Sequence, residues 1–131
     1  MLYAVLCYHH EAEAMAWSKG QDDAVLAKRA AVQAKLAAAG RLGPVARLMP
    51  TTAATTLRSG REPVVIDGPF AETKEQLPGF YVVDCAGLEE AIAFARDLGQ
   101  GGTGALEIRP PRYFTPGTRK ARTTSPGSAR R

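Results

Sequence analysis

Short apolar runs and two longer amphipathic stretches alternate along the first 109 residues. Four runs have strand length: residues 2–8, a segment from about Val45, residues 80–83 and residues 105–109. Between them, residues 22–39 and 88–98 carry apolar side chains at helical spacing, with acidic residues in the first turn. Gly40 directly follows the first of these stretches, where a helix commonly ends. The pattern therefore predicts strand, helix and strand, twice in succession.

A β-hairpin is predicted between these two units. Residues 55–58 and 63–66 are strand-like, and Ser59-Gly60-Arg61 between them is a turn sequence. Pro78-Gly79 is expected to break the chain before the next strand. The order β-α-β, β-hairpin, β-α-β describes the ferredoxin-like α+β plan, in which two βαβ units share one antiparallel sheet.

This plan leaves one face of the sheet without helices. An apolar open face on so small a chain is expected to be buried against a partner. We therefore predict a homodimer that forms through the open sheet face.

Composition and length indicate one globular domain. The chain has 131 residues, and its hydrophobic fraction of 45% is ordinary for a folded protein. No stretch approaches the roughly 20 apolar residues needed to span a bilayer, and the apolar start lacks the basic flank of a secretory signal. Cys7 and Cys85 have no CxxC spacing and are expected to be buried, reduced thiols. These features predict a cytoplasmic protein that does not associate with membranes.

The positive charge of the chain is concentrated at its end. Residues 110–131 contain six of the 17 basic side chains and none of the 13 acidic ones, so the rest of the chain is slightly acidic. A nucleic-acid-binding fold would carry a basic face on its folded part. We expect a domain over residues 1–111 and a disordered basic tail over residues 112–131, which could contact nucleic acid only weakly.

The densest group of ionisable residues lies at 67–75, Asp-Gly-Pro-Phe-Ala-Glu-Thr-Lys-Glu, directly after the hairpin. Asp67 is a candidate catalytic base if burial raises its pKa, and Lys74 could then stabilise an anion. Phe70 and Glu72 would complete a substrate-binding surface. The same pattern is typical of a solvated turn in which Asp67 serves only as a cap.

A second polar group follows the first strand. It contains Tyr8, His9, His10, Glu11 and Glu13. Tyr8 and Glu11 are candidate substrate-binding residues and His9 a candidate catalytic residue, although the cluster is equally compatible with a solvated loop. Adjacent histidines lack the i, i+4 spacing of a helical metal pair, so no metal or cofactor is predicted.

Two further residues near this group have more than one interpretation. Trp17, the sole tryptophan, could pack over the edge of the core, lie at a subunit contact or stack on a ligand. Arg29 lies near the middle of the apolar stripe of the first long helix. It could reach an anionic ligand or direct its charge to water at the edge of the stripe.

The chain resembles the YCII-related or DGPF-domain proteins of the dimeric α+β barrel superfamily. The resemblance covers about residues 1–111 and is strongest in the stretch from Asp67 to Leu77. The other matching segments are residues 54–58, Tyr8 with Glu11, residues 88–91 and residues 107–110. The basic tail lies outside it.

The resemblance implies a ferredoxin-like protomer, a homodimer and a cleft near the DGPF turn, but no particular reaction. The broader YCII group is thought to use a His/Asp pair, and the Asp corresponds to Asp67. The histidine expected near the first helix is absent, because residues 20–40 contain none. Two hypotheses follow: a small-molecule-binding or enzyme-like protein, or a non-catalytic regulatory module linked to sigma factors, as gene context suggests for DGPF proteins.

Overall fold

The fold is built on a four-stranded sheet with the strand order β2-β5-β1-β6. The computed structural model describes residues 1–71, 75–99 and 104–118. The strands are β1 (Leu2–His10), β2 (Leu42–Arg47), β5 (Glu75–Asp84) and β6 (Ala105–Arg109). Each neighbouring pair is antiparallel, and Val5 of β1 lies opposite both Tyr81 of β5 and Ile108 of β6. The predicted α+β class is confirmed, and the order is compatible with the ferredoxin-like plan.

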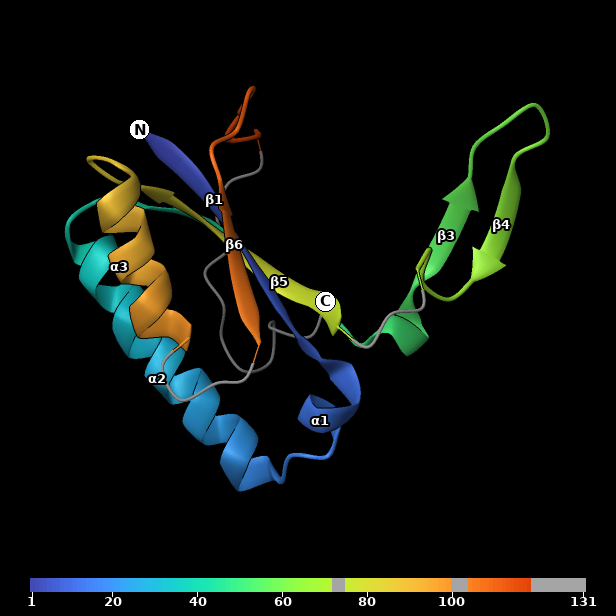
Figure 1. Ribbon diagram of the computed structural model, residues 1–131, viewed down its shortest axis with the longest axis horizontal. Coiled ribbons are helices and arrows are strands. Elements are labelled where there is room, and N and C mark those ends of the chain that lie inside the picture. Colours follow the sequence, from blue (N-terminus) through green and yellow to red (C-terminus); the bar gives the residue numbers. More distant parts are fainter. Residues whose placement is uncertain (72–74, 100–103, 119–131) are drawn as a thin grey trace.

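Two helices lie along one side of this sheet (Figure 1). They are α2 (Lys19–Ala38) and α3 (Leu88–Gly99). Helix α2 begins three residues earlier than predicted, because Ser18 forms a capping box with Gln21. It ends before Gly40, which has a positive φ of 70°.

The core lies between the sheet and these helices. Alternate residues of β1 and β5 point into it, and Val5 and Val83 are fully buried there. Phe94 of α3 meets Tyr81 edge to face, with ring centroids 5.7 Å apart. Cys7 and Cys85 are both buried free thiols, as predicted. Leu6 and Phe80 lie opposite each other on the sheet face that points away from the helices.

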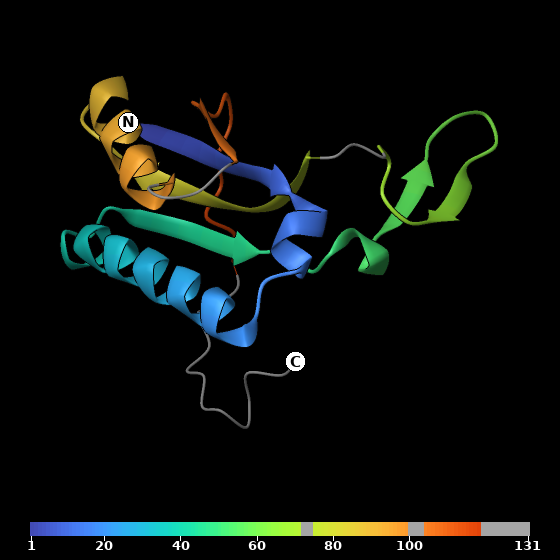
Figure 2. The ribbon, with the colours of Figure 1, turned by 60° about the horizontal axis from the view of Figure 1, so that its bottom comes forward.

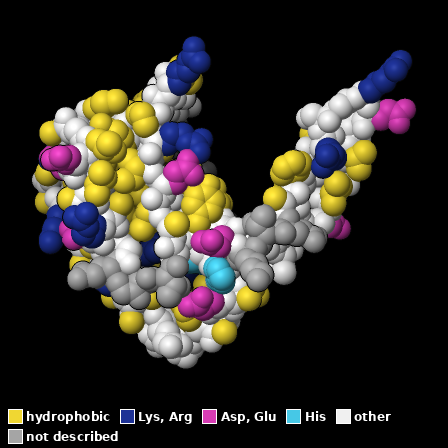
Figure 3. All heavy atoms as spheres, in the orientation of Figure 1, with side chains coloured by type: hydrophobic (Ala, Val, Ile, Leu, Met, Phe, Trp, Pro, Cys, Tyr) yellow, Lys and Arg dark blue, Asp and Glu magenta, His cyan; other side chains and the backbone are white. Residues whose placement is uncertain are grey.

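The predicted hairpin is present, but it forms a separate two-stranded sheet. We define the arm as residues 51–71, which comprise a short 3-10 helix (η1, Thr51–Ala53) and strands β3 (Thr55–Arg58) and β4 (Val64–Asp67). Figure 2 shows the arm extending away from the four-stranded sheet. Its apolar side chains are largely exposed, among them Leu57 (61%) and Val65 (67%) (Figure 3). A lone hairpin of this kind is marginally stable in water.

The prediction that Pro78-Gly79 breaks the chain is wrong. Both residues lie inside β5, which continues from Glu75 to Asp84. The Pro78 carbonyl accepts a hydrogen bond from the Leu48 N–H at 2.6 Å. A Cβ on Gly79 would lie 2.6 Å from the Ala46 carbonyl oxygen, so this glycine allows β2 to approach β5 closely.

The ends of three other elements also differ from the prediction. Strand β2 starts at Leu42 rather than near Val45, because the pair β2–β5 tolerates Gly43-Pro44 at a register shift. Strand β1 extends to His10, and residues 11–15 form a short helix (α1, Glu11–Met15) where a polar loop was expected. Pro50-Thr51-Thr52, expected as a plain connection, contributes to η1.

Residues 112–118 are exposed and belong to no helix or strand, and residues 119–131 of the predicted basic tail lie outside the described residues. In the described ranges, no helix is both long and apolar enough to cross a membrane.

Candidate functional site

Three cavities meet around His9 and Trp17. The inner cavity, of about 290 Å³, lies between β1, β6, α2 and the end of α3. The bridging cavity, of about 100 Å³, passes under α2 toward β2. The outer cleft, of about 620 Å³, lies between α1, the start of α2 and residues 47–51. His9 and Trp17 line all three, so the cavities share these two side chains.

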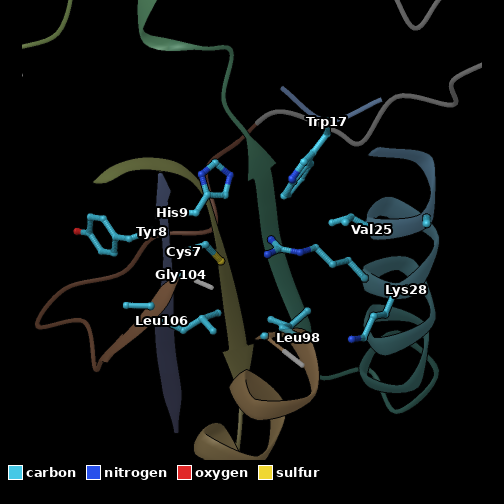
Figure 4. A pocket seen from close by; sticks show the side chains of 13 residues that line it. Cys7, Tyr8, His9, Trp17, Val25, Lys28, Leu98, Gly104 and Leu106 are labelled. Atoms are coloured by element: carbon cyan, nitrogen blue, oxygen red, sulfur yellow. The ribbon is translucent and has the colours of Figure 1, made fainter. Parts of the chain in front are cut away.

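The alternation of β1 places Cys7 and His9 on the helix side of the sheet. The pairing of β1 with β5 is irregular at this point, since Cys7 lies opposite Gly79 whereas His9 lies opposite Gln76. Such an irregularity re-aims a side chain at the edge of a sheet. Figure 4 shows Cys7 and His9 facing the cavity and Tyr8 on the opposite side of β1 from Trp17.

Trp17 lies in the connection between α1 and α2 and lines the inner cavity beside His9. Its indole meets the His9 imidazole edge-on, with centroids 5.9 Å apart and an interplanar angle of 64°. Nδ1 of His9 is buried and has no hydrogen-bond partner within the described part of the chain. The aromatic contact thus fixes a ring whose polar atom remains unsatisfied.

Arg29 reaches the inner and bridging cavities from α2. Its Nε is buried and without a hydrogen-bond partner among the described residues. Burial raises the pKa of the Cys7 thiol, and the nearby Arg29 guanidinium only partly opposes that rise in pKa. Cys7 is therefore a neutral thiol at neutral pH and does not compensate the charge of Arg29.

The walls of the inner cavity are otherwise mainly apolar. Val25, Leu98 and Leu106 contribute from α2, α3 and β6 (Figure 4). Lys28 also lines the inner cavity, and no carboxylate does so among the described residues. The cavity thus combines apolar walls with the basic side chain of Arg29.

The outer cleft has a different character, because its charged groups are already paired. Glu11 accepts hydrogen bonds from the Thr51 N–H (3.0 Å) and the Thr51 hydroxyl (2.7 Å). Arg47 forms an ion pair with Asp22 at 2.7 Å. Glu11, a predicted substrate-binding residue, therefore lines the outer cleft and also holds the start of the arm to α1.

The predicted residues of the DGPF turn lie apart from these cavities within one chain. Asp67 pairs with Thr55 at the end of β4, and it is exposed. Phe70 is 72% exposed and lies beneath the Arg58 guanidinium, 5.5 Å from its ring centroid. Neither residue lines any of the three cavities. Glu72 and Lys74 lie outside the described residues.

The structure thus brings together His9, Trp17 and Arg29, of which only His9 was proposed as a site residue. Tyr8, the other site residue proposed on β1, also lines the inner cavity, but its side chain lies on the opposite side of the strand (Figure 4). Trp17 and Arg29 were singled out from the sequence, but for each of them a structural role without contact to a ligand also stayed open. Nothing in the sequence marked Cys7 as a site residue, because it lies in an apolar run. Among the residues that the structure describes, no group of three or more His, Cys, Asp or Glu side chains could hold a metal ion.

Comparisons with known proteins agree with the resemblance noted in the sequence. Residues 1–115 match the YCII-related domain. An uncharacterized protein of Rhizobium meliloti (strain 1021) is 59% identical over 120 residues, which cover 89% of this chain and 97% of the relative. The chain belongs to the YCII-related family.

Proposed function

We propose that the protein is a homodimeric, cytoplasmic small-molecule-binding protein whose ligand enters the inner cavity between β1 and α2. The observation that carries this proposal is the convergence of His9, Trp17 and Arg29 on a cavity of about 290 Å³. Apolar walls with a few converging polar groups are typical of small-molecule sites. A perturbed thiol pKa at Cys7 is a further feature of such sites.

Two apolar surfaces support the proposed dimer. Leu6 and Phe80, both half-buried, lie on the sheet face that no described helix covers, and the arm exposes Leu57, Val65 and Phe70. Covering such surfaces with a second chain would stabilise both. In this assembly, the arm carries Asp67 and the DGPF turn toward the partner, where the turn could contribute to a cleft.

Trp17 offers a direct test of binding because it is the only tryptophan and lines the inner cavity. We would screen small organic molecules by the emission of Trp17 and by the melting temperature of the full chain. A ligand of this cavity is expected to change both, and the change in emission should saturate. Val25→Phe is the variant chosen to fill the inner cavity and block binding. Val25→Trp would add a second indole whose emission overlaps that of Trp17.

The blocking variant separates binding in the inner cavity from binding elsewhere. Val25→Phe should abolish the response, whereas Val64→Phe on the exposed arm should keep it. Ligands that bind equally to both variants would contradict the proposed site. Light scattering on the same samples tests the dimer, and a monomer mass at micromolar concentration would contradict it.

A further inference from the structure

The geometry points to a small organic carboxylate with an apolar body as the ligand of the inner cavity. Arg29 and His9 would hold the carboxylate, and Val25, Leu98 and Leu106 would pack against the apolar body. This inference rests on the proposed binding function and adds the chemical class of the ligand.

The first step is the uncompensated charge of Arg29. Three arginines on the body of the protein form ion pairs with carboxylates: Arg41 with Glu90, Arg47 with Asp22 and Arg109 with Glu107. Arg29 forms no such pair with any carboxylate in the described ranges. Its guanidinium lies near the neutral Cys7 thiol, and its Nε is buried without a hydrogen-bond partner among the described residues. An unpaired buried donor on a charged group costs free energy that an anion would recover.

The second step is that the unsatisfied atoms come from two different elements. Arg29 belongs to α2, whereas His9 lies near the end of β1 on the opposite wall, and both line the inner and bridging cavities. Nδ1 of His9 is buried without a partner in the described residues, as is Nε of Arg29. Two orphaned polar atoms on facing walls of one cavity indicate a shared ligand group rather than two separate accidents of packing.

The third step is the choice of anion. A guanidinium binds a planar carboxylate through two parallel hydrogen bonds, and the walls at Val25, Leu98 and Leu106 accept an apolar body. A phosphate would need additional hydrogen-bond donors, such as the free backbone N–H groups at the start of a helix. The first N–H groups of α2 do not serve this purpose, because Ser18 caps that end through Gln21. Apart from Arg29 and His9, Lys28 is the only basic side chain in the described lining.

The alternative for Arg29 is that it directs its charge into water. Its side chain is partly exposed, which that alternative requires. The unsatisfied Nε favours a bound anion, because an anion would give this buried donor a partner, whereas water at the two terminal nitrogens would not. A binding experiment with matched ligands separates the two interpretations directly.

The experiment compares hexanoate with hexanamide, which has the same shape without the charge, and with hexyl phosphate. Binding to the full chain is followed by Trp17 emission and by isothermal titration calorimetry. Wild type is expected to bind hexanoate at least about tenfold more tightly than hexanamide, as expected for hydrogen bonds to charged groups. Arg29→Met should remove that preference, and Lys35→Met should keep it, since Lys35 lies on the same helix but lines none of the three cavities.

Arg29→Lys keeps the charge but loses the fork of donors, so we expect it to retain only part of the preference even if Arg29→Met folds poorly. Equal binding of hexanoate and hexanamide, or an unchanged preference in Arg29→Met, would overturn the carboxylate inference and leave the binding function standing. Tighter binding of hexyl phosphate than of hexanoate would also overturn it. If none of the three probes changes Trp17 emission or releases heat at millimolar concentration, both the inference and the proposed function fail.

Discussion

The His9 imidazole meets the Trp17 indole edge-on, with ring centroids 5.9 Å apart. His9 lies near the end of the first strand and Trp17 lies between the two N-terminal helices, so the contact joins the sheet to the start of α2. Three cavities share this pair of side chains. The position of α2, which carries Arg29, is therefore the main structural requirement of the site.

The capping box at the start of α2 should contribute measurably to stability. Ser18 Oγ accepts the Gln21 N–H at 3.1 Å, and the Gln21 side chain accepts the Ser18 N–H at 2.8 Å. We expect Ser18→Ala to lower the free energy of unfolding by about 1 kcal/mol, and the melting temperature by a few degrees. Ser59→Ala, in the turn of the arm, is the matched control and should change neither. Equal melting temperatures for wild type and Ser18→Ala would show that the cap is not needed.

The close approach of β2 to β5 predicts a larger effect at Gly79. A Cβ there would meet the backbone carbonyl of Ala46 at 2.6 Å, and backbone cannot move aside as a side chain can. We expect Gly79→Ala to cost about 1–3 kcal/mol of unfolding free energy, the usual range for overpacking. Urea denaturation measures this cost.

Gly87→Ala is the control for that substitution, because a Cβ at Gly87 meets nothing within 4 Å. Its midpoint of denaturation should equal or exceed that of wild type. Similar losses in the two variants would mean that flexibility of the chain, rather than the approach of the two strands, explains the effect.

The buried thiol of Cys7 predicts a dependence of stability on alkaline pH. Burial raises its pKa in the folded protein, so the folded state holds the proton more firmly than the unfolded state. The stabilisation is complete below the unfolded pKa of about 8.5 and is lost as the pH rises toward the folded pKa. Unfolding free energies between pH 7 and 10 should therefore fall less steeply in Cys7→Ala than in wild type. Parallel curves would contradict this account of Cys7.

The exposed arm predicts a variant that separates assembly from folding. Leu57 and Val65 lie opposite each other on one face of the hairpin, where both are exposed. If the proposed dimer buries this face, Val65→Glu should weaken it by at least about tenfold in dissociation constant, because an unpaired charge is costly to bury. Sedimentation equilibrium measures the shift, with Arg61→Glu at the tip of the hairpin as the control. A dimer of unchanged affinity in Val65→Glu would show that the arm is not part of the interface.

The order of the elements could be predicted from the sequence because their apolar periodicities are strong and local. The hairpin, the last strand and the helix at residues 88–99 follow that pattern closely. Pro78-Gly79 misled the prediction because its role depends on Ala46, which is distant in sequence. The start of α2 was predicted at residue 22 from the acidic first turn, whereas the capping box of Ser18 and Gln21 begins the helix at Lys19.

The candidate site was harder to predict, since it depends on which face of β1 each residue occupies. The irregular pairing between Cys7 and His9 determines where His9 points, and no local pattern in the sequence reveals it. The two possible roles of Arg29 could not be weighed from the sequence, because the cavity that Arg29 lines is formed by residues distant in the chain. The sequence directed attention to the DGPF turn by its density of charge, but in one chain Asp67 lies on the arm.

The most direct test of the central claim is a crystal structure of the full chain grown with hexanoate. We predict electron density for the ligand in the inner cavity, with its carboxylate at Arg29 and His9 and its chain toward Leu106. Density at the Asp67 turn with an empty inner cavity would contradict the account, and would return the site to the DGPF turn.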